Sequence, residues 1–289
     1  MAIKSYKGFD KNLRCRGFQY KIGGIYEMDG KIKMCNRGFH ACESPFDVFD
    51  YYTMIDSRFC EVEQDGNISK EDRGTKICSS KIKIKAELKL ADMINLGVEW
   101  LKEITSPEKI KTSIKDNSSG YGAKIGSSGN DAQIGSSGNG AKIGSSGNGA
   151  KIGSSGNDAQ IGSSGYGAQI GSSGYDAQIG SSGNDAQIGS SGYDAQIGSS
   201  GNGAKIGSSG NGAKIDSTGE DCVIMCAGIN SVAKASKGSW VTLSEWSYSE
   251  EKQRYIPICV KTEFVDGEKI KADTYYSLKG GVFVEWIND

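Results

Sequence analysis

A nine-residue unit repeats without interruption over residues 121–219, so these 99 residues hold eleven copies. Each copy carries alanine and isoleucine two positions apart, as in Ala132 and Ile134, with lysine or glutamine between them. Residues two apart on an extended chain point to the same face, so each copy predicts one short strand with an apolar side. The other six residues are mostly glycine, serine and asparagine, which favour turns. The pattern therefore predicts short strands joined by tight turns and excludes a helix.

Strands joined in this way stack into a parallel β-solenoid, in which each coil supplies backbone hydrogen-bond partners to the next. Nine residues at roughly 3.3 Å each close a loop too small to hold side chains, which favours two units per coil. Eleven units then make five and a half coils, and the rod is roughly 26 Å long at about 4.8 Å per coil. We therefore expect a mainly β chain with this solenoid at residues 118–221.

The segments on either side predict folded ends. Residues 1–117 are expected to form an α+β domain, with a helix that starts at Ser44 and Pro45 and another at 91–104. Strands are predicted at 16–20, 24–26, 59–63 and 76–88, and the alternation in the last of these predicts one wet face. Residues 222–289 are expected to hold a terminal coil, in which Cys222 replaces the repeat alanine, and a small β-cap with strands at 240–246, 255–264 and 282–286.

Composition narrows the partners and the compartment. The formal net charge is -1, so the single-sign field that nucleic-acid binding requires is absent. The first residues lack the apolar core of a signal peptide, and no apolar run is long enough for a transmembrane helix. These features predict a cytoplasmic protein that binds neither nucleic acid nor membranes. Its eight cysteines are then expected to be reduced thiols.

The N-terminal segment holds the few residues that could carry chemistry. His40 is the only histidine, so any histidine-dependent catalysis must use it, and Cys42 is the nearest nucleophile. Cys35, His40 and Cys42, with Cys15 or Cys60, could also form a zinc site, but no close Cys-x-x-Cys pair supports it. Buried thiols and a core histidine are the favoured interpretation. No metal and no cofactor are expected.

The repeats also resemble the calcium-binding nonapeptide repeats of secreted toxins. Their apolar position does not match, because Gln133 falls where the buried residue belongs. Calcium needs six to eight oxygen ligands, and aspartate occurs in only part of the units. Plain turn aspartates are therefore favoured for this position: Asp131, Asp158, Asp176, Asp185 and Asp194.

An eighteen-residue coil places alternate units on one face, which defines two sets of candidate binding residues. One is a row of outward side chains: Lys124, Lys142, Gln160, Gln178, Gln196 and Lys214. The other is three tyrosines that replace asparagine, of which Tyr175 and Tyr193 are expected to stack on neighbouring coils, whereas Tyr166 stands apart. The row fits a solubility role, because stacked like charges repel and glutamines form amide ladders. Both sets also fit recognition of a protein, to which exposed tyrosines contribute strongly.

The two ends resemble an uncharacterised family found in bacterial, prophage and phage genomes, whose members carry variable low-complexity repeats between similar ends. Four motifs carry this resemblance: CRGFQY at 15–20, GFHACESP at 38–45, VDGEKIK at 265–271 and DTYY at 273–276. The resemblance implies a mobile-element origin and supplies no activity. The segment at 38–41 also resembles the core of ADP-ribosyltransferase folds.

These observations support two classes of function. The first is a non-enzymatic binding protein of phage or prophage origin that presents its repeats to a host or phage protein. Inhibition of a host defence complex is one task for it, and a structural role in the virion or tail is the alternative. The second class is an enzyme that uses the N-terminal domain around His40. Because each coil buries few apolar residues, we also expect a homo-oligomer, with a trimer as one form.

Overall fold

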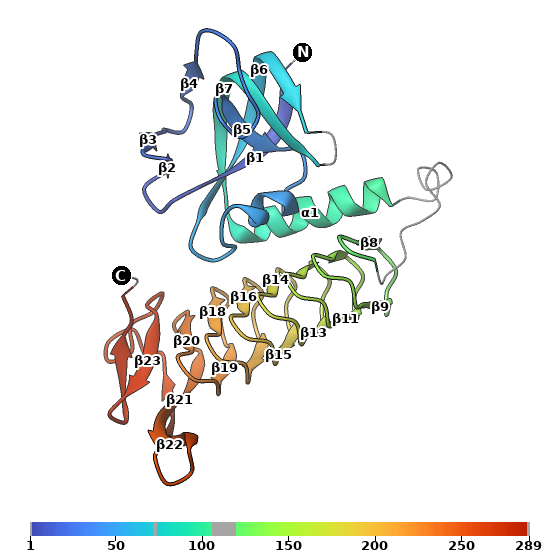
Figure 1. The fold of residues 1–289 in the computed structure, drawn as a ribbon. Coiled ribbons are helices and arrows are strands. Elements are labelled where there is room, and N and C mark those ends of the chain that lie inside the picture. Colours follow the sequence, from blue (N-terminus) through green and yellow to red (C-terminus); the bar gives the residue numbers. More distant parts are fainter. Residues whose placement is uncertain (1, 72–73, 106–119, 288–289) are drawn as a thin grey trace. The chain divides into compact units, whose positions relative to one another are not determined.

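The computed structural model describes residues 2–71, 74–105 and 120–287 (Figure 1). The chain is mainly β, and a parallel β-solenoid of about seven turns spans residues 124–243. This confirms the predicted fold class. The backbone divides into two compact units, Met1–Trp100 and Leu101–Asp289. The domain boundary predicted at 117–118 lies outside the described residues.

The first unit is built around a small antiparallel β-structure. Its strands β1, β6, β7 and β5 pair in a closed ring, and β4 adds to the outside of β7. A separate pair, β2 and β3, precedes β4. The bounds are β1 (Ile3–Phe9), β2 (Arg14–Cys15), β3 (Phe18–Gln19), β4 (Ile25–Glu27), β5 (Phe39–Cys42), β6 (Arg58–Lys70) and β7 (Lys76–Leu88). Inside the ring lies an apolar core that includes Phe9, Val62, Ile82 and Ile84.

Two helical segments accompany these strands, and the second runs past the end of the first unit at Trp100. The predicted start at Ser44 and Pro45 leads into a short 3-10 helix, η1 (Phe46–Asp50), rather than an α-helix, although Ser44 Oγ still accepts a bond from the Asp47 N–H at 3.3 Å. The expected α-helix is present as α1 (Leu90–Ile104). Gly97 of α1 lies so close to the ring of Phe46 that a Cβ there would overlap it. Small size at this position is therefore required for packing.

The repeats form the predicted two-unit coil. Each strand pairs in parallel with the strand eighteen residues later, as Ile143 pairs with Ile161 and Ile152 with Ile170. Alternate units therefore build two separate sheets. The strands are β8 (Lys124–Ser127), β9 (Gln133–Ser136), β10 (Lys142–Ser145), β11 (Lys151–Ser154), β12 (Gln160–Ser163), β13 (Gln169–Ser172), β14 (Gln178–Ser181), β15 (Gln187–Ser190), β16 (Gln196–Ser199), β17 (Lys205–Ser208), β18 (Lys214–Ser217), β19 (Val223–Cys226) and β20 (Val232–Ala235).

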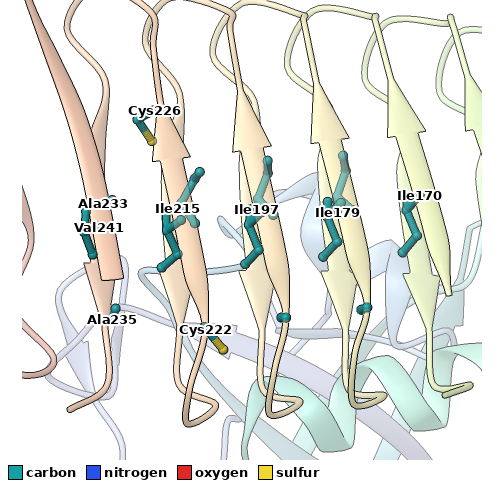
Figure 2. Close-up of a cluster of buried hydrophobic side chains, with 14 of the residues drawn as sticks. Ile170, Ile179, Ile197, Ile215, Cys222, Cys226, Ala233, Ala235 and Val241 are labelled. Atoms are coloured by element: carbon teal, nitrogen blue, oxygen red, sulfur yellow. The ribbon is translucent and has the colours of Figure 1, made fainter. Parts of the chain in front are cut away.

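The interior of the solenoid is a stack of isoleucine and alanine side chains (Figure 2). From Ile143 onward, each repeat isoleucine is at most 4% exposed, and the repeat alanines from Ala141 onward are fully buried. Cys222 occupies the alanine position of the next unit, as predicted, and Ile224 continues the stack. Each coil therefore buries only a few apolar side chains, and the serine of each strand fills the rest of its interior.

The strand serines point inward, where their hydroxyls have little to bond. Ser145 Oγ accepts a long bond of 3.4 Å from the Gly147 N–H. In the later coils of the same sheet, four buried hydroxyl groups have no hydrogen-bond partner among the described residues: Ser163, Ser181, Ser199 and Ser217. The terminal coils carry apolar residues in this place, with Cys226 beside Ser208 and Ala235 beside Ser217. Unpaired buried hydroxyls cost stability.

We expect replacement of these four serines by alanine to stabilise the protein. Relief of each unpaired hydroxyl is worth roughly 0.5–1 kcal/mol, so the quadruple variant gains about 2–4 kcal/mol. Thermal unfolding followed by circular dichroism measures the gain. Ser173→Ala, at an exposed turn position, is the matched control and should leave the melting temperature unchanged. A lower melting temperature in the quadruple variant would show that the hydroxyls are bonded in solution.

The residue before each repeat alanine is either aspartate or glycine, and the backbone of the turn explains why. This residue has a positive φ in every unit of the repeat, for example 55° at Asp131 and 67° at Gly149. Aspartate, asparagine and glycine tolerate this left-handed backbone better than other residues. The favoured interpretation of the aspartates as turn residues therefore has a backbone cause.

A second turn position forms a ladder of asparagines along the rod. The Asn157 side-chain carbonyl accepts a bond from the Tyr175 N–H at 3.0 Å, one coil further on, and Asn184 accepts one from the Asn202 N–H at 2.9 Å. Each such asparagine therefore ties its own coil to the next. A tyrosine at the same position lacks this carbonyl and cannot continue the ladder.

Adjacent coils also approach closely at the glycine before each asparagine. At Gly183, a Cβ atom would lie 2.0 Å from the carbonyl oxygen of Gly165 in the preceding coil. The same contact recurs along both turns of the solenoid, so the spacing between coils depends on the absence of a side chain at this position.

The C-terminal strands cover the last coil. Next to β19, its sheet continues with β21 (Trp240–Ser249), which pairs with β22 (Arg254–Phe264). In the other sheet, β20 pairs with β23 (Tyr276–Lys279) and β23 with β24 (Val282–Glu285). The Glu245 carboxylate accepts the N–H groups of Gly280 and Gly281 at 2.8 and 2.9 Å, which ties the two hairpins together. The predicted β-cap is present, and β23 is an additional strand. Such a cap closes a sheet edge that would otherwise be open.

Candidate functional site

The first unit contains a cavity of about 460 Å³ that brings His40 and Cys42 together. β1, β5 and the segment around β2 and β3 supply its walls, and Tyr51 and Tyr52 follow from the end of η1. Cys15 and Cys35 also line it, so three of the cysteines singled out in the sequence share one cavity with the only histidine. Cys60, in contrast, is fully buried in the core of the ring.

A buried lysine that the sequence did not single out lies at this cavity. Lys7 of β1 is only 5% exposed, and its ammonium group donates to the carbonyl oxygen of His40 at 2.9 Å and to Cys15 Sγ at 3.5 Å. The rings of Phe9 and Tyr20 lie 5.4 and 5.9 Å from it. Burial lowers the pKa of Lys7, and Cys15 opposes this shift. The strand β1 was not predicted from the sequence, so this lysine could not be placed.

The environment of His40 favours the neutral form of its ring. Its Nε2 accepts a hydrogen bond from the Cys35 backbone N–H at 3.0 Å. Burial lowers the pKa of His40, and the positive charges of Lys7, Lys76 and Arg16 lower it further. A neutral imidazole that already accepts a backbone bond on Nε2 supports the predicted structural role for His40. Lys7, Lys76 and Arg16 line the same cavity as His40.

The thiols of this cavity have different surroundings. Cys15 Sγ accepts a bond from the Tyr52 hydroxyl at 3.0 Å, and Cys35, which is exposed, lies 3.5 Å from Lys76 Nζ. Cys42 is buried. Within the described part of the chain, no group of three or more histidine, cysteine, aspartate or glutamate side chains is arranged to hold a metal ion.

On the solenoid, the predicted row is stacked in register along one sheet. Lys142 pairs with Lys124 and Gln160, and the row continues to Lys214. Its side chains lie on the face of the sheet opposite the buried isoleucines, because the two kinds of residue alternate along each strand. At the end of the row, Lys214 Nζ lies 4.3 Å from the Trp286 ring and 4.5 Å from the Tyr275 ring, so the C-terminal strands cover it.

The tyrosines occupy two different edges of the rod. Tyr175 and Tyr193 lie one above the other, with ring centroids 5.2 Å apart and an angle of 13° between the planes. They are 52% and 46% exposed. Tyr166 lies in a turn on the other edge, where the nearby Asp185 carboxylate raises the pKa of the Tyr166 hydroxyl group. The stacked pair thus forms a flat aromatic surface, which Tyr166 does not share.

A column of three carboxylates runs beside the stacked tyrosines on the same edge of the rod. Asp158, Asp176 and Asp194 occupy the left-handed turn position of three consecutive coils. Partial burial raises the pKa of Asp176, and the negative charges of Asp158 and Asp194 raise it further. This column therefore carries repulsion that the fold does not require, because glycine occupies the same position in other coils. We call Asp158, Asp176, Asp194, Tyr175 and Tyr193 the tyrosine–aspartate edge.

The outer face of the second sheet is a shallow groove of about 1080 Å³ along β9 to β19. Outward glycines such as Gly153 and Gly189 form its floor, and nothing lies within 4 Å of a Cβ atom built on them. Its charged lining residues are Lys151 and Lys205. The groove ends at the exposed side chains of Val223 and Met225, so this face is weakly basic and open.

Comparison with known families finds a match that lies within the first unit. Residues 3–96 match a domain of unknown function, DUF7666. The matched segment includes Lys7, His40 and Cys42 and ends before the solenoid begins. Comparisons with curated proteins and with solved structures find no match. The family therefore names the domain that holds the cavity and brings no activity with it.

The sequence predicts no transmembrane helix. In residues 2–71, 74–105 and 120–287, no helix has both the length and the apolar character needed to cross a membrane.

Proposed function

We propose that this chain is a non-enzymatic binding protein whose solenoid presents the tyrosine–aspartate edge to a protein partner. The observation that carries the proposal is the exposed, stacked pair of Tyr175 and Tyr193. Tyrosines are strongly enriched among the residues that dominate binding energy at protein interfaces. A rigid pair of rings also loses little conformational entropy when it is covered.

The tyrosines have a cost to the fold, which supports a role in binding. Asparagine at this position bonds the backbone of the next coil, as Asn157 does with the Tyr175 N–H. Tyr175 and Tyr193 give up two such bonds, each worth about 1 kcal/mol. The adjoining column of three aspartates adds repulsion between like charges. Features that reduce stability and lie together on one exposed edge are typical of functional surfaces.

The chemistry of this edge favours a basic partner. Two stacked tyrosine rings attract guanidinium and ammonium groups through their faces, and the three carboxylates accept charge-assisted hydrogen bonds from the same groups. Arginine supplies both contacts with one side chain. The predicted row of Lys124, Lys142, Gln160, Gln178 and Gln196 remains a second candidate surface.

Capture of partners from a bacterial lysate tests the proposal. Tyr175→Asn/Tyr193→Asn introduces the residue that the repeat itself uses at this position, so the asparagine ladder is restored and the melting temperature should hold or rise. We expect the proteins retained by the wild type to bind this variant at least thirtyfold more weakly, since a central tyrosine contributes about 2 kcal/mol or more.

Tyr166→Asn is the matched control, because it makes the same change on the other edge of the rod. It should retain the partners of the wild type. Capture of an identical set of proteins by all three chains, or of none by the wild type, would contradict the proposed binding edge.

The biological setting belongs to the same proposal. The motifs at both ends support an origin in a phage or prophage, and inhibition of a host defence complex is the task that a cytoplasmic binding protein of that origin would serve. A structural role in the virion or tail is the alternative. Self-association of the chain, as a trimer or another homo-oligomer, also remains part of the proposal, supported by the thin core of each coil.

An enzyme is the second candidate, favoured by the cavity that joins His40, Cys42 and Lys7. Burial and nearby cations lower the pKa of its histidine, which favours the neutral ring that a general base requires. However, the His40 Nε2 already accepts the Cys35 N–H, and Cys42 is buried. The binding proposal is therefore preferred for the chain as a whole.

A further inference from the structure

The cavity of the first unit has a one-sided charge. Three of its lining residues are cations, Lys7, Arg16 and Lys76, and none is an aspartate or a glutamate. Among the described residues, no carboxylate lies within salt-bridge distance of any of the three. Elsewhere on the same unit, lysines such as Lys85 do pair with carboxylates, in this case Glu63 at 2.6 Å. Among the described residues, the cavity therefore gathers positive charge without a carboxylate paired to it.

Burial of the Lys7 ammonium group is energetically unfavourable unless a negative charge compensates it. Its ammonium group is buried, and its two bonds go to a neutral carbonyl and to a thiol. A buried ammonium group without a counter-charge costs several kcal/mol. The lowered pKa of Lys7 reflects that cost, and an anion in the cavity would remove it.

The other two cations surround the same space from different segments. Arg16 follows β2 and has a φ of 50°, a strained backbone for arginine, and Cys35 on the opposite loop has a φ of 60°. Strained residues of this kind cluster at ligand sites. Lys76 begins β7, where its Nζ lies 4.2 Å from the centroid of the Tyr51 ring. Lys7, Lys76 and Arg16 all line the cavity together with His40, and their positive charges all lower the pKa of His40.

Aromatic rings form the rest of the wall. Phe18, Tyr20, Tyr51 and Tyr52 all line the cavity, and Phe18 and Tyr51 are 49% and 52% exposed. Exposed rings beside a cationic pocket offer a surface on which a planar ring can stack. The volume of about 460 Å³ is within the range of small-molecule sites. Plain inorganic ions would use the cations and leave these rings uncovered.

We propose that this cavity binds a nucleotide, with its phosphates on Lys7, Arg16 and Lys76 and its base against the rings of Phe18 and Tyr51. Guanidinium and ammonium groups are the side chains that proteins use most for phosphate, and their bonds to it are strong because they are charge-assisted. The site lies in the domain matched by DUF7666 and is independent of the tyrosine–aspartate edge, so either proposal can fail without the other.

Calorimetric titration of the full chain with ADP, GDP and UDP tests the site. We expect saturable binding of one molecule per chain for at least one of the three, weakened as the salt concentration rises. Arg16→Gln and Lys76→Gln should each weaken it at least tenfold. These two side chains are outside the buried core, so both variants should fold, and their melting curves confirm it.

Arg14→Gln is the matched control. Arg14 is two residues from Arg16 and does not line the cavity, because its guanidinium bonds to Gln19 at 2.9 Å. Its affinity should remain within twofold of the wild type. Binding of none of the three nucleotides, or binding that survives both cavity substitutions, would overturn the proposal. So would pyrophosphate that binds as tightly as the best nucleotide, because the rings would then contribute nothing.

Discussion

Gly183→Ala should destabilise the solenoid by about 3 kcal/mol or more, because the added methyl group has no space between coils. A Cβ atom at this position would lie 2.0 Å from the Gly165 carbonyl oxygen, which is backbone and cannot rotate away. Relief requires the coils to separate, and separation breaks the parallel ladder on both sheets. Chemical unfolding of the variant, followed by circular dichroism, measures the loss.

Gly189→Ala is the control for this prediction. Gly189 lies in β15 with its α-carbon facing the open groove, where an added Cβ atom meets nothing within 4 Å. Alanine also restricts the unfolded chain more than glycine does, so this variant should be as stable as the wild type or up to about 1 kcal/mol more stable. Equal effects of the two substitutions would show that the close approach between coils is absent in solution.

Deletion of nine residues should move a marked side chain to the opposite face of the rod, whereas deletion of eighteen should bring it closer on the same face. Gly153 and Gly189 both face outward from the second sheet, two coils apart. With pyrene attached to cysteines at these two positions, removal of residues 160–177 makes them neighbours at about 4.8 Å and should raise excimer fluorescence severalfold. Removal of residues 160–168 should abolish it.

The comparison requires a background without other reactive thiols. Cys35 is exposed, and Cys15 and Cys259 are partly exposed, so these three are changed to serine. Both deletions remove whole repeat units and should unfold cooperatively. Equal excimer signals in the two deletions would refute the eighteen-residue coil.

The solenoid was predictable from the sequence because its information is local. Ala132 and Ile134 fix the inward face of a strand, and the same spacing recurs in every unit, so the period alone sets the coil. The first unit offered less. β1 carries the mixed sequence Ile3–Phe9, without the alternation that identifies a strand, and its place between β5 and β6 depends on long-range pairing.

Of the two candidate sites, only the one that depends on local spacing could be predicted from the sequence. The stacking of Tyr175 on Tyr193 follows from a spacing of eighteen residues and was predicted. The cavity was not, because Lys7, Arg16 and Lys76 belong to three separate segments of the chain and look like ordinary surface cations in the sequence. Only the closed ring of strands reveals that Lys7 is buried. The available signal for the burial of Lys7 was its position beside Tyr6 and two residues before Phe9. Apolar neighbours on a strand raise the chance that a residue is buried.

The spacing of the coils also limits which shapes can follow the tyrosine–aspartate edge. Its carboxylates repeat at about 4.8 Å, close to the 5.4 Å pitch of an α-helix. A helix laid along the edge drifts by only about 1.2 Å between Asp158 and Asp194, within the reach of flexible arginines. Alternate side chains of an extended strand are about 6.7 Å apart and drift by about 3.8 Å over the same distance. The spacing of the carboxylates therefore matches the pitch of an α-helix. Basic side chains that recur every three or four residues of a helical partner can each contact one carboxylate of the edge.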